Sequence, residues 1–144
     1  MIKKPEQIYE KAWGQEIWWK NIPEYCSKTL KLQGGYYCSL HRHSLKLESF
    51  ICQSGIISLA LENNKGEIDF FELEAGDVVD IPIGKHHSFY GVLGWNEILE
   101  VSTQHFESDS YRLFKSGFFD TCEKWESLVK ETWEYIKNNP YSGD

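Results

Sequence analysis

The feature that most constrains the fold is a succession of short strand-like segments, each ended by turn residues, between residues 25 and 103. Eight segments carry the alternation or the β-branched and aromatic content of strands: Cys26–Leu32, Tyr36–His41, Leu47–Gln53, Gly55–Glu62, Ile68–Leu73, Asp77–Ile81, His87–Gly91 and Glu97–Thr103. The breaks between them contain glycine, proline or asparagine, which favour turns. Many short strands at this spacing are typical of an all-β sandwich or barrel.

The two flanks of this region have a different character. An amphipathic piece at Ile8–Trp13 and a strand-like run at Glu16–Lys20 indicate an N-terminal extension. Near the other end, Asp120 reads as a helix N-cap with Glu123 at the third helical position, and apolar residues then recur at helical spacing. We therefore expect a C-terminal α-helix over about 121–138. The 144 residues suit one domain, so we predict a single domain over 1–144, with its barrel core over about 25–103.

Charge and composition exclude several classes of partner. The formal net charge is −7, which argues against nucleic acid, because that affinity comes mainly from Lys and Arg on phosphates. No apolar run approaches the roughly 20 residues that span a bilayer, so no membrane contact is expected. Four cysteines form no CxxC pair, and the first residues lack the apolar region of a signal peptide. These features predict a cytoplasmic protein with reduced thiols.

Three histidines and a glutamate form the most informative pattern. A strand places residues two apart on one face, so His41 and His43 should project together into one interior. Glu48 follows a turn and can return on the adjacent strand, and His87 comes just after the Pro82–Gly84 turn. Three imidazoles and one carboxylate suit one divalent ion (Zn, Mn, Fe, Ni or Co) with open coordination positions. A His-x-His pair alone is a weak signal, because such a pair is more often two exposed or core histidines.

The spacing of these residues identifies a resemblance. The first stretch matches every fixed position of the first cupin motif: Gly35, His41, His43, Glu48 and Gly55. The second matches the second cupin motif up to its histidine: Gly76, Pro82, Gly84 and His87. Gly91 replaces the asparagine that usually ends the second motif. The chain thus resembles the cupin superfamily over about residues 30–103, which implies a double-stranded β-helix, or jelly-roll, barrel that holds a metal ion. His86 should point to the other face as a surface or packing residue.

Segments outside the motifs resemble a narrower group. The Lys11–Gly14 segment is similar to one that precedes the barrel in phosphomannose isomerase-like domains, although Ala12 replaces a proline. The stretch from Glu100 to Arg112 resembles the tail of the same group. These segments imply a small sugar-isomerase-like cupin, related to mannose-6-phosphate isomerase-like proteins and to stand-alone proteins of surface-polysaccharide sugar biosynthesis. Because one fold hosts many chemistries, this activity does not transfer automatically.

The resemblance implies aldose–ketose isomerisation or epimerisation through a metal-stabilised enediolate. Glu100 is the candidate base that would move the proton, with a structural carboxylate as the alternative. Lys46, beside the ligands, is a candidate catalytic or anion-binding residue, with a solvated loop lysine as the alternative. Candidate substrate contacts are Tyr37, Phe50, Phe89, Lys11 and Arg112; core packing is the alternative for the three aromatic residues.

Two other functions fit the same pattern. The ligand set suits an Fe(II)-dependent dioxygenase equally well, and a non-catalytic cupin that binds a sugar or small anion needs no base. The aromatic content of 15% favours a sugar as the small-molecule substrate only weakly. Exposed sheet edges need covering, so a homodimer is expected.

Overall fold

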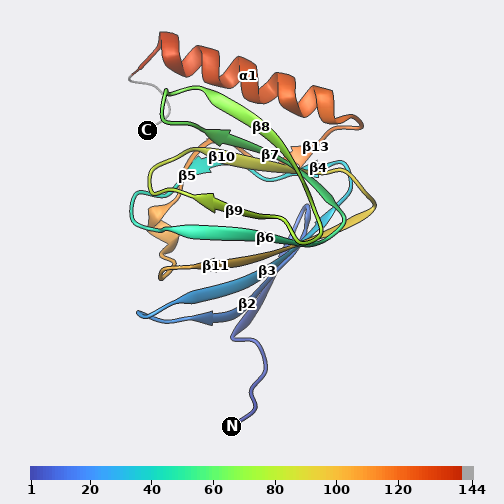
Figure 1. Cartoon of the computed structure of the whole chain (residues 1–144), viewed down its shortest axis with the longest axis vertical. Helices are drawn as coiled ribbons and strands as arrows, with labels where there is room; N and C mark the ends of the chain where they lie inside the picture. Colours follow the sequence, from blue (N-terminus) through green and yellow to red (C-terminus); the bar gives the residue numbers. More distant parts are fainter. Residues whose placement is uncertain (141–144) are drawn as a thin grey trace.

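Two antiparallel sheets face each other across a shared core in this computed structural model, which describes residues 1–140 (Figure 1). The strands are β1 (Gln7–Lys11), β2 (Gly14–Asn21), β3 (Cys26–Gln33), β4 (Tyr36–Tyr37), β5 (Leu40–Arg42), β6 (Glu48–Ser54), β7 (Ile56–Glu62), β8 (Ile68–Glu74), β9 (Val78–Ile81), β10 (His87–Gly91), β11 (Trp95–Ser102), β12 (Tyr111–Phe114) and β13 (Gly117–Phe118). A short 3₁₀ helix, η1 (Glu107–Asp109), follows β11, and an α-helix, α1 (Cys122–Asn138), follows β13.

The order of the strands explains how distant motifs meet. The first sheet runs β1-β2-β3-β11-β6-β9. In the second sheet β10 lies between β7 on one side and the short strands β5 and β4 on the other, while β8, β12 and β13 extend it. Strands from both motifs are therefore neighbours in each sheet: β6 and β9 in the first, and β10 beside β4 and β5 in the second. The expected all-β cupin jelly roll with a C-terminal helix is confirmed.

The core lies between the two sheets, as the alternating burial of residues along the strands shows. Along β3, every second residue from Cys26 to Leu32 is buried, and the residues between them are half-exposed. Apolar side chains from the facing strands, such as Phe50, Ile57 and Ile98, complete the interior cluster. Each fully buried aliphatic or aromatic side chain of this kind contributes about 1.5–3 kcal/mol.

The helix α1 covers the outer face of the second sheet, next to β7 and β8 (Figure 1). Trp125 and Val129 are fully buried there and form a second apolar cluster with residues of the sheet. The N-cap is Thr121, whose side chain accepts from the main-chain N–H of Lys124, so the expectation of Asp120 was wrong by one residue. Within the described residues, the helix is neither long nor apolar enough to cross a bilayer.

Several strand boundaries differ from the prediction. The segment 36–41, expected as one strand, is broken into β4 and β5. The N-terminal piece contains an exposed five-residue strand, β1, which pairs with β2 at the edge of the first sheet. The strands β12 and β13 had no sequence signal, because each is only two to four residues long and exists by pairing with β5 or β4.

Candidate metal centre and cavity

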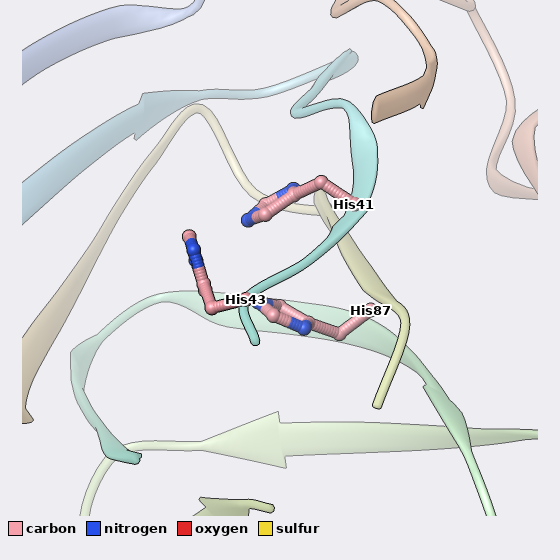
Figure 2. Close-up of side chains that lie close together, drawn as sticks. All are labelled: His41, His43 and His87. Atoms are coloured by element: carbon pink, nitrogen blue, oxygen red, sulfur yellow. The ribbon is translucent and has the colours of Figure 1, made fainter. Parts of the chain in front are cut away.

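Three histidines from separate parts of the chain converge inside the barrel (Figure 2). His41 lies in β5 directly opposite His87, the first residue of β10, and His43 follows the end of β5. One nitrogen from each ring lies within 4.8 Å of the other two. His87 is fully buried and His43 is 5% exposed, so the cluster lies away from bulk water.

Hydrogen bonds orient all three rings in the same way. Each Nδ1 lies within bonding distance of a main-chain carbonyl oxygen: that of Ser39 for His41 (2.9 Å), of Asp109 for His43 (2.7 Å) and of Lys85 for His87 (3.0 Å). A carbonyl only accepts, so Nδ1 carries the proton and Nε2 keeps its lone pair. This arrangement holds a histidine ready to bind a metal through Nε2.

Glu48, the first residue of β6, completes the donor set. Its Oε2 lies 3.1 Å from Nε2 of His87 and 3.6 Å from Nε2 of His43. Both Glu48 Oε2 and His87 Nε2 are buried without a hydrogen-bond partner among the described residues. Two buried acceptors this close are unfavourable unless a cation lies between them. The side chains therefore fit a divalent metal ion.

The protonation states agree with this fit. Burial, reinforced by Lys46, lowers the pKa of His43 to about 4, and burial together with the neighbouring histidines holds the pKa of His41 well below its usual value. Both rings are thus neutral at pH 7, which is the state that metal binding requires.

Lys46 lies beside this cluster, and its donors are already engaged. Its Nζ is 2.9 Å from Glu100 Oε2, 3.2 Å from Glu48 Oε1 and 3.1 Å from Nδ1 of His105. Although burial opposes the charge, Glu100 and Glu48 raise the pKa of Lys46, which stays an ammonium. An ammonium has three N–H donors, and these three partners use them. Lys46 therefore positions two carboxylates.

A cavity of about 290 Å³ opens beside the cluster and is lined by both sheets. It contains the candidate base Glu100 and the candidate substrate contacts Phe50, Phe89, Lys11 and Arg112. Its wall also includes three residues without a predicted role, namely Glu16 of β2, Lys28 of β3 and Lys115 after β12. The volume is just below the roughly 300–1,000 Å³ of drug-sized pockets, which suits a smaller molecule such as a monosaccharide.

Tyr37 lies outside the cavity, contrary to its prediction as a substrate contact, which assumed a regular strand with Tyr37 on the face of His41 and His43. Its ring stacks on Phe119 (5.3 Å between centroids) in the cluster below α1. Tyr37 pairs with Tyr90 of β10, and His41 pairs with His87. The chain therefore advances four residues from β4 to β5 while β10 advances three. One extra residue reverses which side of the sheet each side chain faces.

Asp109 in η1 holds the loop 44–46, which lies between the candidate ligands His43 and Glu48. Its carboxylate accepts hydrogen bonds from the main-chain N–H groups of Ser44, Leu45 and Lys46 and from the Ser44 hydroxyl. The same residue's carbonyl accepts from His43. The sequence could not assign this role, because Asp109 is more than sixty residues from the loop.

His86 points away from the cluster, as its place next to His87 predicts. Its Nδ1 lies 3.0 Å from Glu62 Oε1, and its ring packs edge-on against Trp133 of α1. All four cysteines are unpaired. Cys38 lines the cavity, and burial raises the pKa of its thiol to about 12, so it is not a reactive nucleophile at neutral pH.

Comparison with known proteins defines the class. Neither a family model nor a curated protein matches the sequence. Solved structures do match, and their shared architecture together with the two-sheet barrel described above shows that this chain has the cupin fold.

Three of these structures illustrate the likeness. The capsular polysaccharide assembling protein CapF from Staphylococcus aureus is 19% identical, with a TM-score of 0.69 over 76% of this chain and 32% of its own. Oxalate decarboxylase from Bacillus subtilis is 18% identical, with a TM-score of 0.66 over 92% of this chain and 36% of its own. KdgF from Halomonas sp. is 17% identical, with a TM-score of 0.57 over 65% of this chain and 81% of its own. This chain thus spans about a third of the first two proteins.

At these identities the likeness concerns the fold. Oxalate decarboxylase contains Mn(II) centres, which shows that a barrel of this kind can hold a divalent ion. The histidine cluster of the present chain can hold one as well.

Proposed function

We propose that this protein is a metal-dependent sugar or sugar-phosphate isomerase or epimerase. The observation that carries the proposal is the pairing, in one cavity, of a metal-binding cluster with a buried carboxylate, Glu100, that is not part of the cluster. Isomerisation between an aldose and a ketose needs these two elements, an electrophile at the oxygens and a base at the carbons.

His41, His43, His87 and Glu48 would hold one divalent ion. When bound, the ion supplies Lewis acidity at the carbonyl and hydroxyl oxygens of the substrate. Phe50 and Phe89 line the cavity beside the cluster and exclude water from that region.

Glu100 would move the proton. Lys46 and Ser102 both contact its Oε2, at 2.9 and 3.2 Å, and no described residue bonds to Oε1. Oε1 can therefore take the proton from C2 of an aldose and return it to C1, while the hydroxyl proton of the substrate passes from O2 to O1. Lys46 keeps the side chain in place and is a positioning residue in this scheme.

Metal analysis and isotope exchange test the proposal. Purified protein should contain about one divalent ion per chain, and incubation with a suitable sugar or sugar phosphate in D₂O should place deuterium at C2. Glu100→Gln should lose at least about 100-fold of the exchange rate while keeping its metal, given the usual contribution of a general base. Glu97→Gln is the matched control, because Glu97 lies on the outer side of the same strand, paired with Lys31.

The outcomes separate this function from its alternatives. Unchanged exchange in Glu100→Gln removes Glu100 as the base. Full metal content with oxygen consumption and no exchange would replace the isomerase by a dioxygenase. Binding of a sugar without turnover would identify a non-catalytic cupin.

The setting of this activity is also proposed. We infer a cytoplasmic homodimer that acts in surface-polysaccharide sugar biosynthesis. The outer face of the first sheet exposes Ile8, Trp19, Val78 and Val101, and β1 forms an open edge of that sheet within residues 1–140. A second copy would cover both features. Sedimentation equilibrium tests this, and Val101→Asp should shift a dimer towards monomer.

A further inference from the structure

Lys28 is a buried cation in the cavity wall whose bonding capacity is largely unused. Its side chain is 2% exposed, and its Nζ lies 3.3 Å from Glu16 Oε1 and 4.0 Å from the centre of the Trp18 ring. No other described residue accepts from it. Glu16 Oε1 is shared, because it also accepts from Trp18 Nε1 at 2.7 Å. A buried ammonium with one carboxylate among three donors is under-satisfied.

The sheet register places Lys28 in line with the proposed base. On the inner face of the first sheet, Lys28 of β3 pairs with Glu100 of β11, which pairs with Phe50 of β6. Glu48 lies two residues from Phe50 on the same face. Strands lie 4.7–4.9 Å apart, so β3 and β6 are separated by about 10 Å with Glu100 between them. A molecule held at Lys28 and at the histidine cluster would pass Glu100.

Apart from Lys46, three other cations line the cavity and have no carboxylate partner within residues 1–140. Lys11, Arg112 and Lys115 line its exposed part, and none forms an ion pair within the described residues. The carboxylates of the cavity wall are already engaged: Glu16 by Lys28, Glu48 and Glu100 by Lys46, and Glu107 by His105. The lining thus has five lysine or arginine side chains against four carboxylates, one net positive charge before any metal ion is counted, in a protein whose net charge is −7. Such a site attracts an anion.

We propose that Lys28 anchors an acidic group of the substrate, a carboxylate or a phosphate, at the end of the cavity away from the histidine cluster. Lys11, Arg112 and Lys115 contribute attraction at the opening. The proposal deepens the isomerase function above and rests on it, because it makes the substrate a sugar phosphate or a sugar acid and excludes a neutral sugar.

Binding measurements test this separately from catalysis. Isothermal titration of the metal-loaded protein with glucose, glucose 6-phosphate and glucuronate compares the neutral sugar with its two acidic forms. We expect at least one acidic form to bind about tenfold or more tightly than glucose, the scale of one hydrogen bond to a charged group. Which acidic form is preferred distinguishes phosphate from carboxylate. The preference should shrink as salt is added.

Two variants and a control assign the effect to Lys28. Lys28→Met should remove the preference for the acidic form, whereas Lys31→Met, on the outer face of the same strand, should keep it. Glu16→Gln should strengthen anion binding severalfold, because it removes the carboxylate that competes for Lys28. A purely structural role for Lys28 predicts no gain in anion binding in Glu16→Gln. The Glu16→Gln variant therefore tests the anion-binding role of Lys28 even if Lys28→Met does not fold.

The failures of the two proposals are distinguishable. Equal binding of glucose and both acids, or unchanged or weaker anion binding in Glu16→Gln, overturns the role of Lys28 and leaves the exchange test of the isomerase untouched. Selective anion binding without deuterium exchange removes the isomerase and retains Lys28 as an anion site.

Discussion

The substitution Asp109→Asn tests how the loop 44–46 is held. Asparagine has the same shape, and its remaining oxygen can still accept from the N–H and hydroxyl of Ser44, as Asp109 Oδ1 does at 2.8 and 2.7 Å. Its NH₂ group, however, would face the N–H groups of Leu45 and Lys46, which now bond to Oδ2 at 3.1 and 3.2 Å. Because the N–H of Leu45 also bonds to Oδ1, at 3.2 Å, the variant leaves only the N–H of Lys46 without an acceptor and removes the charge from the remaining contacts.

The magnitude follows from these contacts. Leaving a buried donor without its partner costs about 1–3 kcal/mol, so the loss of the acceptor for the Lys46 N–H gives about 1–3 kcal/mol for the substitution. For a chain of this length, each kcal/mol lowers the melting temperature by roughly 3 °C, so Tm should fall by about 3–9 °C. Metal affinity should fall about 10–100-fold as well, because the loop follows His43 and contains Lys46.

Calorimetry of the metal-free protein and a metal titration measure the two effects. Asp80→Asn is the control: Asp80 is an exposed aspartate whose carboxylate accepts from the Ser49 hydroxyl, and its loss should cost less than about 0.5 kcal/mol. A Tm for Asp109→Asn within about 2 °C of that control, less than the shift expected for 1 kcal/mol, would show that the carboxylate does not hold the loop.

The pH dependence gives a second test of Asp109. Although burial opposes ionisation, hydrogen bonds from Ser44 and Leu45 lower the pKa of the carboxyl below its usual 3.8. The unfolded chain therefore binds this proton first, and the stabilisation is present above about pH 3.8 and disappears as pH falls through the folded-state pKa. The difference in the free energy of unfolding between wild type and Asp109→Asn should therefore become smaller as the pH falls through that acidic range. A constant difference would contradict the assignment.

Three further predictions concern the barrel and the helix. Gly91→Asn, which restores the usual cupin residue, should destabilise by about 1–3 kcal/mol in urea unfolding, because a Cβ there would lie 2.7 Å from Asn96 Nδ2. Metal-free protein should lose stability as pH falls from 6.5 to about 4, since the unfolded chain protonates His43 while the folded chain does not; in His43→Gln, pH-dependent unfolding should show a shallower slope. Thr121→Ala should cost about 1 kcal/mol by thermal unfolding, because the bond to Lys124 N–H is lost.

Local rules predicted most of the strands that carry the candidate metal ligands. The turn residues and the two-residue period of strands indicated the barrel, and motif spacing selected His87 over His86, which the structure places on opposite sides of β10. The same rules failed at Tyr37, because they assume a regular strand and the chain inserts one residue between β4 and β5. A single extra residue leaves no reliable trace in the sequence. It nevertheless places the Tyr37 side chain in the core under α1 instead of in the cavity.

The burial of Lys28 also has a signal in the sequence. Alternation along Cys26–Gln33 places Lys28 on the same face as Cys26, Leu30 and Leu32, all of them buried. A lysine on an otherwise apolar strand face indicates a buried partner or a ligand. The sequence does not reveal that the partner is Glu16, because this depends on the register of β2 against β3, in which Lys28 pairs with Trp18 and Glu16 lies two residues further along the same strand.

Sequence periodicity and turn residues predicted an all-β sandwich or barrel, and the resemblance of two motifs to those of cupins narrowed this to the jelly roll that the structure has. The same motif spacing selected the four candidate metal ligands, of which three, His41, His43 and His87, form the cluster in the structure. Only the tertiary structure shows the interactions around these candidate ligands. Hydrogen bonds to main-chain carbonyls orient the three Nε2 atoms inward, and Lys46 forms ion pairs with two carboxylates. Asp109 holds the loop 44–46. These interactions join residues up to sixty-six positions apart. A charged side chain finds its partner only when sheet pairing makes two distant strands neighbours, and no local property of either segment specifies that meeting.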